Sequence, residues 1–85
     1  PPEISNIEIK NVQPFSATVC FRTNEPVIGI VQYGEEKGNY PYSVSTDEYN
    51  TSHCLNLLRL KMGTKYYLRI IAIDKNGNKS IKTTR

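Results

Sequence analysis

The segment KYYLRIIAIDKNGN, residues 65–78, reads as a β-strand followed by a tight turn. Its side chains alternate at a period of two, which is the period of a strand. One face carries Tyr66, Leu68, Ile70 and Ala72, and the other carries Tyr67, Arg69, Ile71 and Ile73. Asn76-Gly77 can supply the two positive φ angles of a hairpin turn. The segment therefore predicts a hairpin strand that is apolar on both faces. A strand with one solvent-exposed face should instead be polar on that face.

Short β-rich runs separated by turn residues recur along the rest of the chain, and we find no convincing helix. The expected strands are residues 4–9, 17–22, 27–33, 42–45, 53–58, 66–73 and 80–84. Residues 23–26, TNEP, are expected to turn between the second and third strands, because Pro26 pre-sets a turn-compatible φ. Strands at this spacing in 85 residues indicate one domain, residues 1–85, with an all-β fold and two packed antiparallel sheets.

The segment LRLKMGTKYYLRIIAIDKNGNKS resembles the C-terminal strands of a fibronectin type III domain. The resemblance is closest to the bacterial and archaeal type, which is also found at the N-terminus of purple-acid-phosphatase-like enzymes. The matching positions are Leu60, Gly63, Thr64, Tyr66, Ile70, Ala72, Asp74, Gly77 and Asn78. Upstream, PPEISNIEIKNV, SATVCFRTNEP and VQYG match the first three strands. Two positions depart from the pattern, since Met62 replaces the usual Pro and Phe21 replaces a frequent Trp.

This resemblance implies a seven-stranded immunoglobulin-like β-sandwich. It makes Tyr66 the tyrosine corner, with its ring packed inward and its hydroxyl bonded to nearby backbone. The core residues expected on this basis are Val19, Phe21, Val31, Tyr33, Leu55, Leu57, Leu60, Tyr66, Leu68, Ile70 and Ala72.

The other face of the 66–73 strand is then left pointing away from the core. In this fold the 27–33 strand pairs beside it, and the same alternation places five candidate interface residues outside: Ile28, Ile30, Tyr67, Ile71 and Ile73. One interpretation is that the alkyl stems of Arg69 and nearby lysines cover them. The others are an interface with a neighbouring domain of the same chain or with a free ligand. Ile71→Lys is expected to distinguish these interpretations. If the face is an interface, the variant should leave the isolated module folded but prevent it from docking on its partner.

Cys20 and Cys54 are the only cysteines, and both are expected to point outward from neighbouring strands of the opposite sheet. A disulfide needs their Cα atoms within about 7 Å, and the register that decides this is not readable from the sequence. The pair is therefore either a cross-strand disulfide or two independent thiols. The first alternative would imply an oxidising, extracellular setting.

Composition and charge argue against several other classes of protein. The net charge of +3 comes from Lys and Arg scattered among acidic residues, without the basic stripe and interleaved aromatics that bind nucleic acid. No apolar stretch approaches the roughly 20 residues of a membrane span. His53 is the only histidine, and we expect it to be packed rather than to act as a base. No Ser or Cys lies in a nucleophile motif, and two cysteines do not complete a zinc site. We therefore predict no enzymatic activity, no cofactor and no metal.

The resemblance implies a non-catalytic, monomeric module of a secreted or surface-attached, prokaryotic protein. Its partners would be the neighbouring domains of a longer chain, which it spaces, orients or docks; the opening Pro1-Pro2 is typical of a linker. One alternative is a recognition module for a carbohydrate or protein ligand, using the outer face or the rings of Tyr40, Tyr42 and Tyr49. Another is the N-terminal accessory domain of a metallophosphoesterase-like enzyme.

Overall fold

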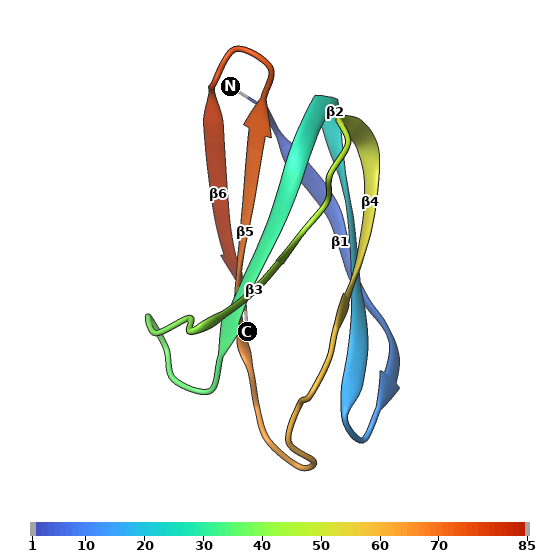
Figure 1. The fold of residues 1–85 in the computed structure, drawn as a ribbon, viewed down its shortest axis with the longest axis vertical. Helices are drawn as coiled ribbons and strands as arrows, with labels where there is room; N and C mark the ends of the chain where they lie inside the picture. Colours follow the sequence, from blue (N-terminus) through green and yellow to red (C-terminus); the bar gives the residue numbers. More distant parts are fainter. Residues whose placement is uncertain (1, 85) are drawn as a thin grey trace.

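The structure is a computed structural model that describes residues 2–84, and none of these residues is helical. The strands are β1 (Ile4–Gln13), β2 (Ser16–Gly34), β3 (Tyr42–Ser45), β4 (Asn50–Leu57), β5 (Tyr67–Asp74) and β6 (Lys79–Thr84). Every pairing between them is antiparallel, and together they form one curled sheet (Figure 1). The all-β, antiparallel fold class predicted from the sequence is confirmed. The described chain has six strands, where the sequence indicated seven.

The difference in strand number arises at β2, which combines the second and third expected strands in 19 residues. Its first half pairs with β1 and β4, and its second half pairs with β3 and β5. The turn predicted at residues 23–26 is wrong, because the chain stays extended there and only the register with β4 shifts, between Arg22 and Val27. Pro26 is compatible with this extended backbone, because its fixed φ is close to that of an extended chain. Pro26 has no N–H to donate, and this costs least here, where the pairing between β2 and β4 is interrupted.

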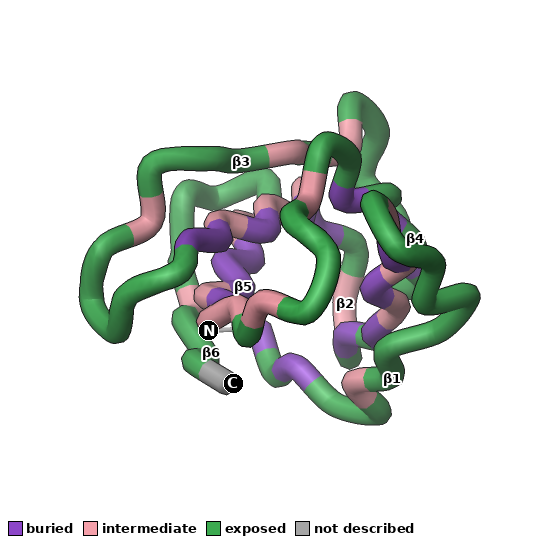
Figure 2. Tube along the Cα trace, turned by 90° about the horizontal axis from the view of Figure 1, so that it is seen from below, coloured by how far each residue is buried: buried purple, intermediate pink, exposed green. Residues whose placement is uncertain are grey.

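The curled sheet closes around one hydrophobic core, so that it has two layers. The first half of β2 lies with β1 and β4 in one layer, and its second half lies with β3, β5 and β6 in the other (Figure 2). Buried side chains from both layers form the core cluster: Ile4, Val19, Phe21, Val27, Val31, Tyr33, Leu55, Leu57, Leu68, Ile70 and Ala72. Two residues of the expected core, Leu60 and Tyr66, are only half-buried and pack against its edge.

Tyr66 lies just before β5 and joins the connection between β4 and β5 to the rest of the fold. Its hydroxyl accepts a hydrogen bond from the backbone N–H of Lys61 at 2.8 Å, which is the contact that a tyrosine corner makes. Its ring packs edge-on against the ring of Tyr33, with 6.3 Å between centroids.

The turn between β5 and β6 follows the Asn76-Gly77 signal with a different geometry from the one expected. Only Gly77 has a positive φ, of 85°. The side chain of Asp74 holds the turn instead, because its Oδ1 accepts hydrogen bonds from the backbone N–H groups of Asn76 and Asn78 at 2.9 and 2.8 Å. The loop between the strands spans residues 75–78, so it is longer than a two-residue turn, and the short polar side chain of Asp74 stabilises it.

Gly29 lies close to the ring of Phe21 in the core, near the point where β2 passes from one layer to the other. The ring of Phe21 stacks on that of His53, with 4.7 Å between centroids. A methyl group added at Gly29 would lie 2.7 Å from Cζ of Phe21, well inside contact distance. The ring of Phe21 is 1% exposed and stacked on His53, so moving it away from Gly29 would disturb this packing.

We therefore expect Gly29→Ala to destabilise the fold by about 1–3 kcal/mol through overpacking. Shortening the opposing ring with Phe21→Leu should relieve the clash, so that the double variant is more stable than the sum of the two single effects predicts. Urea unfolding of the four proteins measures this coupling. Effects that simply add would show that Gly29 is not required by the Phe21 ring.

Tyr66→Phe removes the hydroxyl that bonds to Lys61 N–H and leaves the ring. We expect a loss of about 1 kcal/mol of unfolding free energy, the usual net value of one hydrogen bond. Tyr42→Phe is the matched control, because the Tyr42 ring is exposed and its hydroxyl makes no hydrogen bond to any described residue. Equal unfolding free energies for the two variants would contradict the structural role of the Tyr66 hydroxyl.

Candidate functional site

The outer face of the second layer carries a cluster of isoleucines from three adjacent strands. Ile28 lies opposite Ile73, and Ile30 lies opposite Ile71. On the next strand Ile71 lies opposite Ile81, so that all five side chains share one face. We call Ile28, Ile30, Ile71, Ile73 and Ile81 the isoleucine face.

Ile81 is the member of this face that the sequence analysis missed. It is the only large apolar residue of β6 and is 56% exposed. Its position follows from the register of the β5–β6 hairpin. Ile73 lies opposite Lys79 next to the turn, and two residues further along each strand Ile71 lies opposite Ile81. Counting outward from the Asn76-Gly77 signal at a fixed register would have found it.

Tyr67 shares the outward direction of these isoleucines but lies apart from them. It pairs with Gly34 at the far end of β5, and the pair of Arg69 and Gln32 lies between. Nε of Arg69 donates to Oε1 of Gln32 at 2.7 Å, which places a polar row across the sheet. The expected patch of five residues is therefore divided, with four of them in the isoleucine face and Tyr67 beyond the polar row.

The isoleucine face is less exposed than an outward-facing strand suggests. Ile71, at its centre, is only 9% exposed, because its neighbours on both adjacent strands flank it. Ile28, Ile30 and Ile73 are half-buried. The most accessible part lies at β6, where the sheet ends. Charge lies at the margins, with Arg69 on one side and Lys79, opposite Ile73, on the other.

The two cysteines lie on the outer face of the opposite layer. Cys20 of β2 and Cys54 of β4 are direct cross-strand partners with Cα atoms 4.1 Å apart, and their Sγ atoms are bonded. Cys54 is exposed and Cys20 is half-buried. The register that the sequence left open thus joins β2 to β4 covalently, and none of the described cysteines is free.

The three tyrosines considered for carbohydrate binding each contact a different neighbour. The guanidinium of Arg69 lies 4.7 Å from the centre of the Tyr40 ring, and the ammonium of Lys75 lies 5.5 Å from that of Tyr49. The ring of Tyr42 packs against Tyr33, with 5.5 Å between centroids. Each ring is engaged by its own partner.

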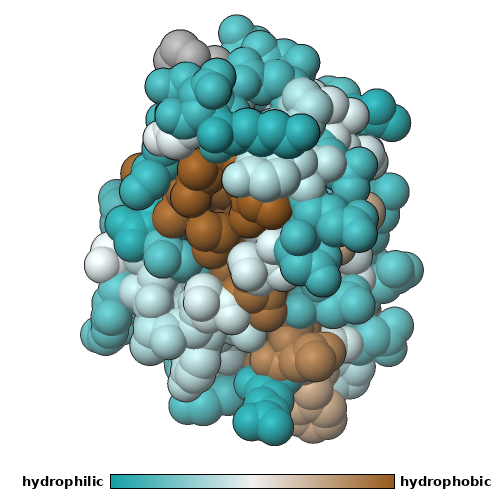
Figure 3. Space-filling view, turned by 45° about the horizontal axis from the view of Figure 1, so that its top comes forward, coloured by the Kyte–Doolittle hydropathy of each residue, from teal (hydrophilic) through white to brown (hydrophobic). Residues whose placement is uncertain are grey.

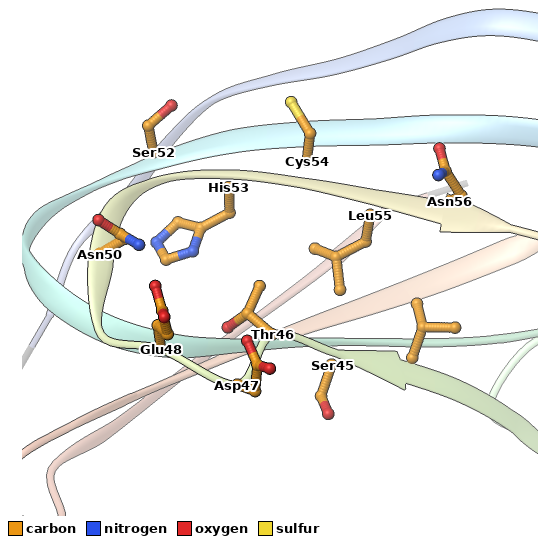
Figure 4. Close-up of a pocket in the computed structure, with 11 residues that line it drawn as sticks. Ser45, Thr46, Asp47, Glu48, Asn50, Ser52, His53, Cys54, Leu55 and Asn56 are labelled. Carbon is orange, nitrogen blue, oxygen red and sulfur yellow. The ribbon is translucent and has the colours of Figure 1, made fainter.

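A cleft of about 420 Å³ lies between β3 and β4 (Figure 4). His53 and Leu55 point into it from β4, while Ser52 and Cys54 point to the other side of that strand. The carboxylates of Asp47 and Glu48 lie across the cleft from the imidazole. These are the polar groups on which any chemistry of the cleft would depend.

The environment of His53 favours the neutral form of its imidazole. Nε2 lies 3.2 Å from Oγ1 of Thr23, and that hydroxyl in turn donates to the carbonyl oxygen of Glu25 at 2.9 Å. The hydroxyl therefore accepts from Nε2–H, which leaves Nδ1 as the unprotonated nitrogen. Nδ1 is buried and has no hydrogen-bond partner among the described residues. Charging the ring would place a proton on this desolvated atom, so burial lowers the pKa of His53.

The stability of the fold is expected to fall as the pH is lowered from about 7.5 to about 5.5. A histidine in the unfolded chain titrates near pH 6.5, and the pKa of folded His53 lies below that value, so the unfolded chain binds more protons in this interval. His53→Gln is the control, because it removes the only histidine and can still bond to Thr23. Urea unfolding at three pH values measures the slope, which His53→Gln should flatten. An equal slope in both proteins would refute the assignment.

Within residues 2–84, no three His, Cys, Asp or Glu side chains lie close enough together to hold a metal ion. The described part of the chain contains no helix that is long and apolar enough to cross a membrane. In comparisons with known proteins, no family model matches the chain and no curated protein is significantly similar to it.

Proposed function

We propose that this chain is a non-catalytic, fibronectin type III-like module that spaces, orients or docks the neighbouring domains of a larger protein. The observation that carries the proposal is the isoleucine face, which presents apolar side chains from three adjacent strands on the outside of the sheet. Contiguous apolar surface of this kind is typical of interaction sites.

The arrangement of the strands supports the fibronectin type III part of the proposal. With the two halves of β2 counted separately, one layer has three strand segments and the other has four. This is the number expected of a seven-stranded sandwich. The hydrogen bond between the Tyr66 hydroxyl and Lys61 N–H adds a second feature of that fold.

A domain of the same chain is the partner that best suits a face of this size. The isoleucine face is shallow, and its central residue is almost fully covered by its own neighbours. A separate protein would have to compensate the full entropy of association with this small surface. A domain tethered by a linker meets the face at a high effective concentration, so that weak contacts are enough to hold it.

The disulfide supports a secreted or surface-attached setting for the module. Cys54 is exposed, and its bond to Cys20 would meet the thiol-reducing systems of a cytosol directly. Bonds of this kind persist in oxidising compartments. The prokaryotic source rests on the resemblance of the sequence.

The docking proposal predicts a change in backbone hydrogen exchange between the chain alone and the chain within its longer parent protein. In the parent, amides of residues 27–33 and 67–73 should exchange more slowly, because a neighbour covers the strands that carry the isoleucine face. Ile81→Lys should abolish this difference while the isolated chain stays folded, since Ile81 is 56% exposed. Ile71→Lys is a poorer choice than the sequence suggested, because the side chain is only 9% exposed and the variant would bury a charge.

Ile9→Lys is the matched control for this experiment. Ile9 lies on β1, in the opposite layer, and is 49% exposed, so its variant makes the same change in charge away from the isoleucine face. It should leave the slow exchange of the parent protein intact. Exchange rates that are the same in the isolated chain and in the parent would overturn the docking proposal.

A further inference from the structure

One end of the molecule is formed by two connections that lie side by side. Residues 14–15 make the turn between β1 and β2, and residues 58–66 connect β4 to β5. The backbone N–H of Leu60 donates to the carbonyl oxygen of Phe15 at 2.9 Å, which ties one connection to the other. Figure 1 shows both at the lower end of the long axis.

Four large apolar side chains are strongly exposed at this end. Val12 is 69% exposed, Phe15 58%, Leu58 59% and Met62 65%. We call these four residues the apolar end. Exposed apolar residues scattered singly need no explanation, but a group of them at one end of a domain is typical of an interaction surface. Figure 3 shows hydrophobic surface running in a band toward the lower end of the molecule, between hydrophilic side chains.

The local backbone holds these side chains outward. Asn11 has a φ of 51° at an irregularity of the β1–β2 ladder, so Val12 lies outside regular pairing. Phe15 is in the turn itself. Leu58 follows the buried Leu57 and takes the opposite direction. Their exposure is therefore a consequence of the fold on both connections.

The two segments that form the apolar end carry charges of one sign. Residues 10–16 and 58–66 contain four of the eleven Lys and Arg of the chain, namely Lys10, Arg59, Lys61 and Lys65, and none of its eight acidic residues. Lys10 pairs with Glu8 at 3.1 Å and Lys61 with Glu35 at 3.2 Å, both with acids from outside these segments. Neither Arg59 nor Lys65 has a carboxylate partner among the described residues.

We propose that the apolar end docks on the surface of a lipid bilayer that contains anionic lipids. Exposed apolar side chains enter the boundary between headgroups and acyl chains, and cations close to them attract an anionic surface. The four apolar residues project from the end of β1 and from the two connections, and a fluid layer adapts to such projections without a matching groove. A second copy of the chain is a poor partner, because face-to-face ends would bring their cations together. This inference does not depend on the isoleucine face.

Docking by this end would also leave the rest of the module accessible. The molecule measures 38 × 24 × 20 Å, and the apolar end lies at one end of the long axis (Figure 1). The β5–β6 turn and the isoleucine face lie on other parts of the surface. A neighbouring domain and a bilayer would therefore bind different regions of the same module.

The first test is co-sedimentation of the whole chain with vesicles of phosphatidylcholine, with and without phosphatidylglycerol. We expect binding to the anionic vesicles that weakens when the salt is raised from about 0.05 M to about 0.5 M. The double variant Phe15→Ser/Met62→Ser should lower the affinity by about tenfold or more, since it removes two apolar side chains from the contact. Tyr49→Ser, 43% exposed and in the connection between β3 and β4, away from the apolar end, should bind as the natural chain does.

Charge variants separate the electrostatic contribution from the apolar one. Arg59→Glu/Lys65→Glu should abolish the preference for anionic vesicles, whereas Lys75→Glu/Lys79→Glu, at the β5–β6 turn, should retain it. Each variant is first checked for an unchanged unfolding transition, so that a loss of binding does not report a loss of fold.

A spectroscopic measurement gives an independent answer, because the chain contains no tryptophan. Phe15→Trp places a single fluorophore at the apolar end, and its emission should shift to the blue and be quenched by brominated lipid. Tyr49→Trp, in the connection between β3 and β4, should show neither change. Failure of the natural chain to bind anionic vesicles would overturn the proposal, and so would a solution dimer that Phe15→Ser disrupts, which would make a second copy the occupant.

Discussion

Strand β2 is the constraint on which the rest of this structure depends. Every other strand except β6 pairs with it directly, and β6 pairs with its neighbour β5. Side chains at odd positions point inward along its whole length, from Ala17 and Phe21 in one layer to Val31 and Tyr33 in the other. Because this alternation is not interrupted at Pro26, one strand supplies the inner face of both layers, and the sheet must curl around a single core.

The contact between Tyr66 and Lys61 links the stability of the core to the surface proposed for membrane docking. Its hydrogen bond holds the connection of residues 58–66 against the end of the core, beside the β1–β2 turn. The exposed side chains of Leu58 and Met62 belong to this same connection. Together with the hydrogen bond from Leu60 N–H to the Phe15 carbonyl, this tyrosine therefore helps to fix where two apolar side chains meet the solvent.

Much of the fold follows from local pattern. β3 has the expected bounds, the β5–β6 hairpin forms at Asn76-Gly77, and most of the expected core residues are buried, because each depends on alternation and turn residues close by in the chain. The expectations that failed concern contacts between distant segments. The turn predicted at residues 23–26 is absent because β2 has partners in both layers, which the sequence does not show. The isoleucine face excludes Tyr67 and includes Ile81. Both facts follow from which residues lie opposite each other on neighbouring strands, and the alternation of side chains along one strand does not show this.

The sequence by itself determined that this protein is an antiparallel all-β domain, that side chains alternate between two faces along each strand, and that His53 is the only histidine. These properties follow from residue type and from a period of two along the chain. The tertiary structure alone decided that Cys20 lies opposite Cys54, that Ile71 is covered by its neighbours, and that Phe15 lies beside Leu60. Such facts depend on register and on how the sheet curls, and these are set by the packing of the whole core at once.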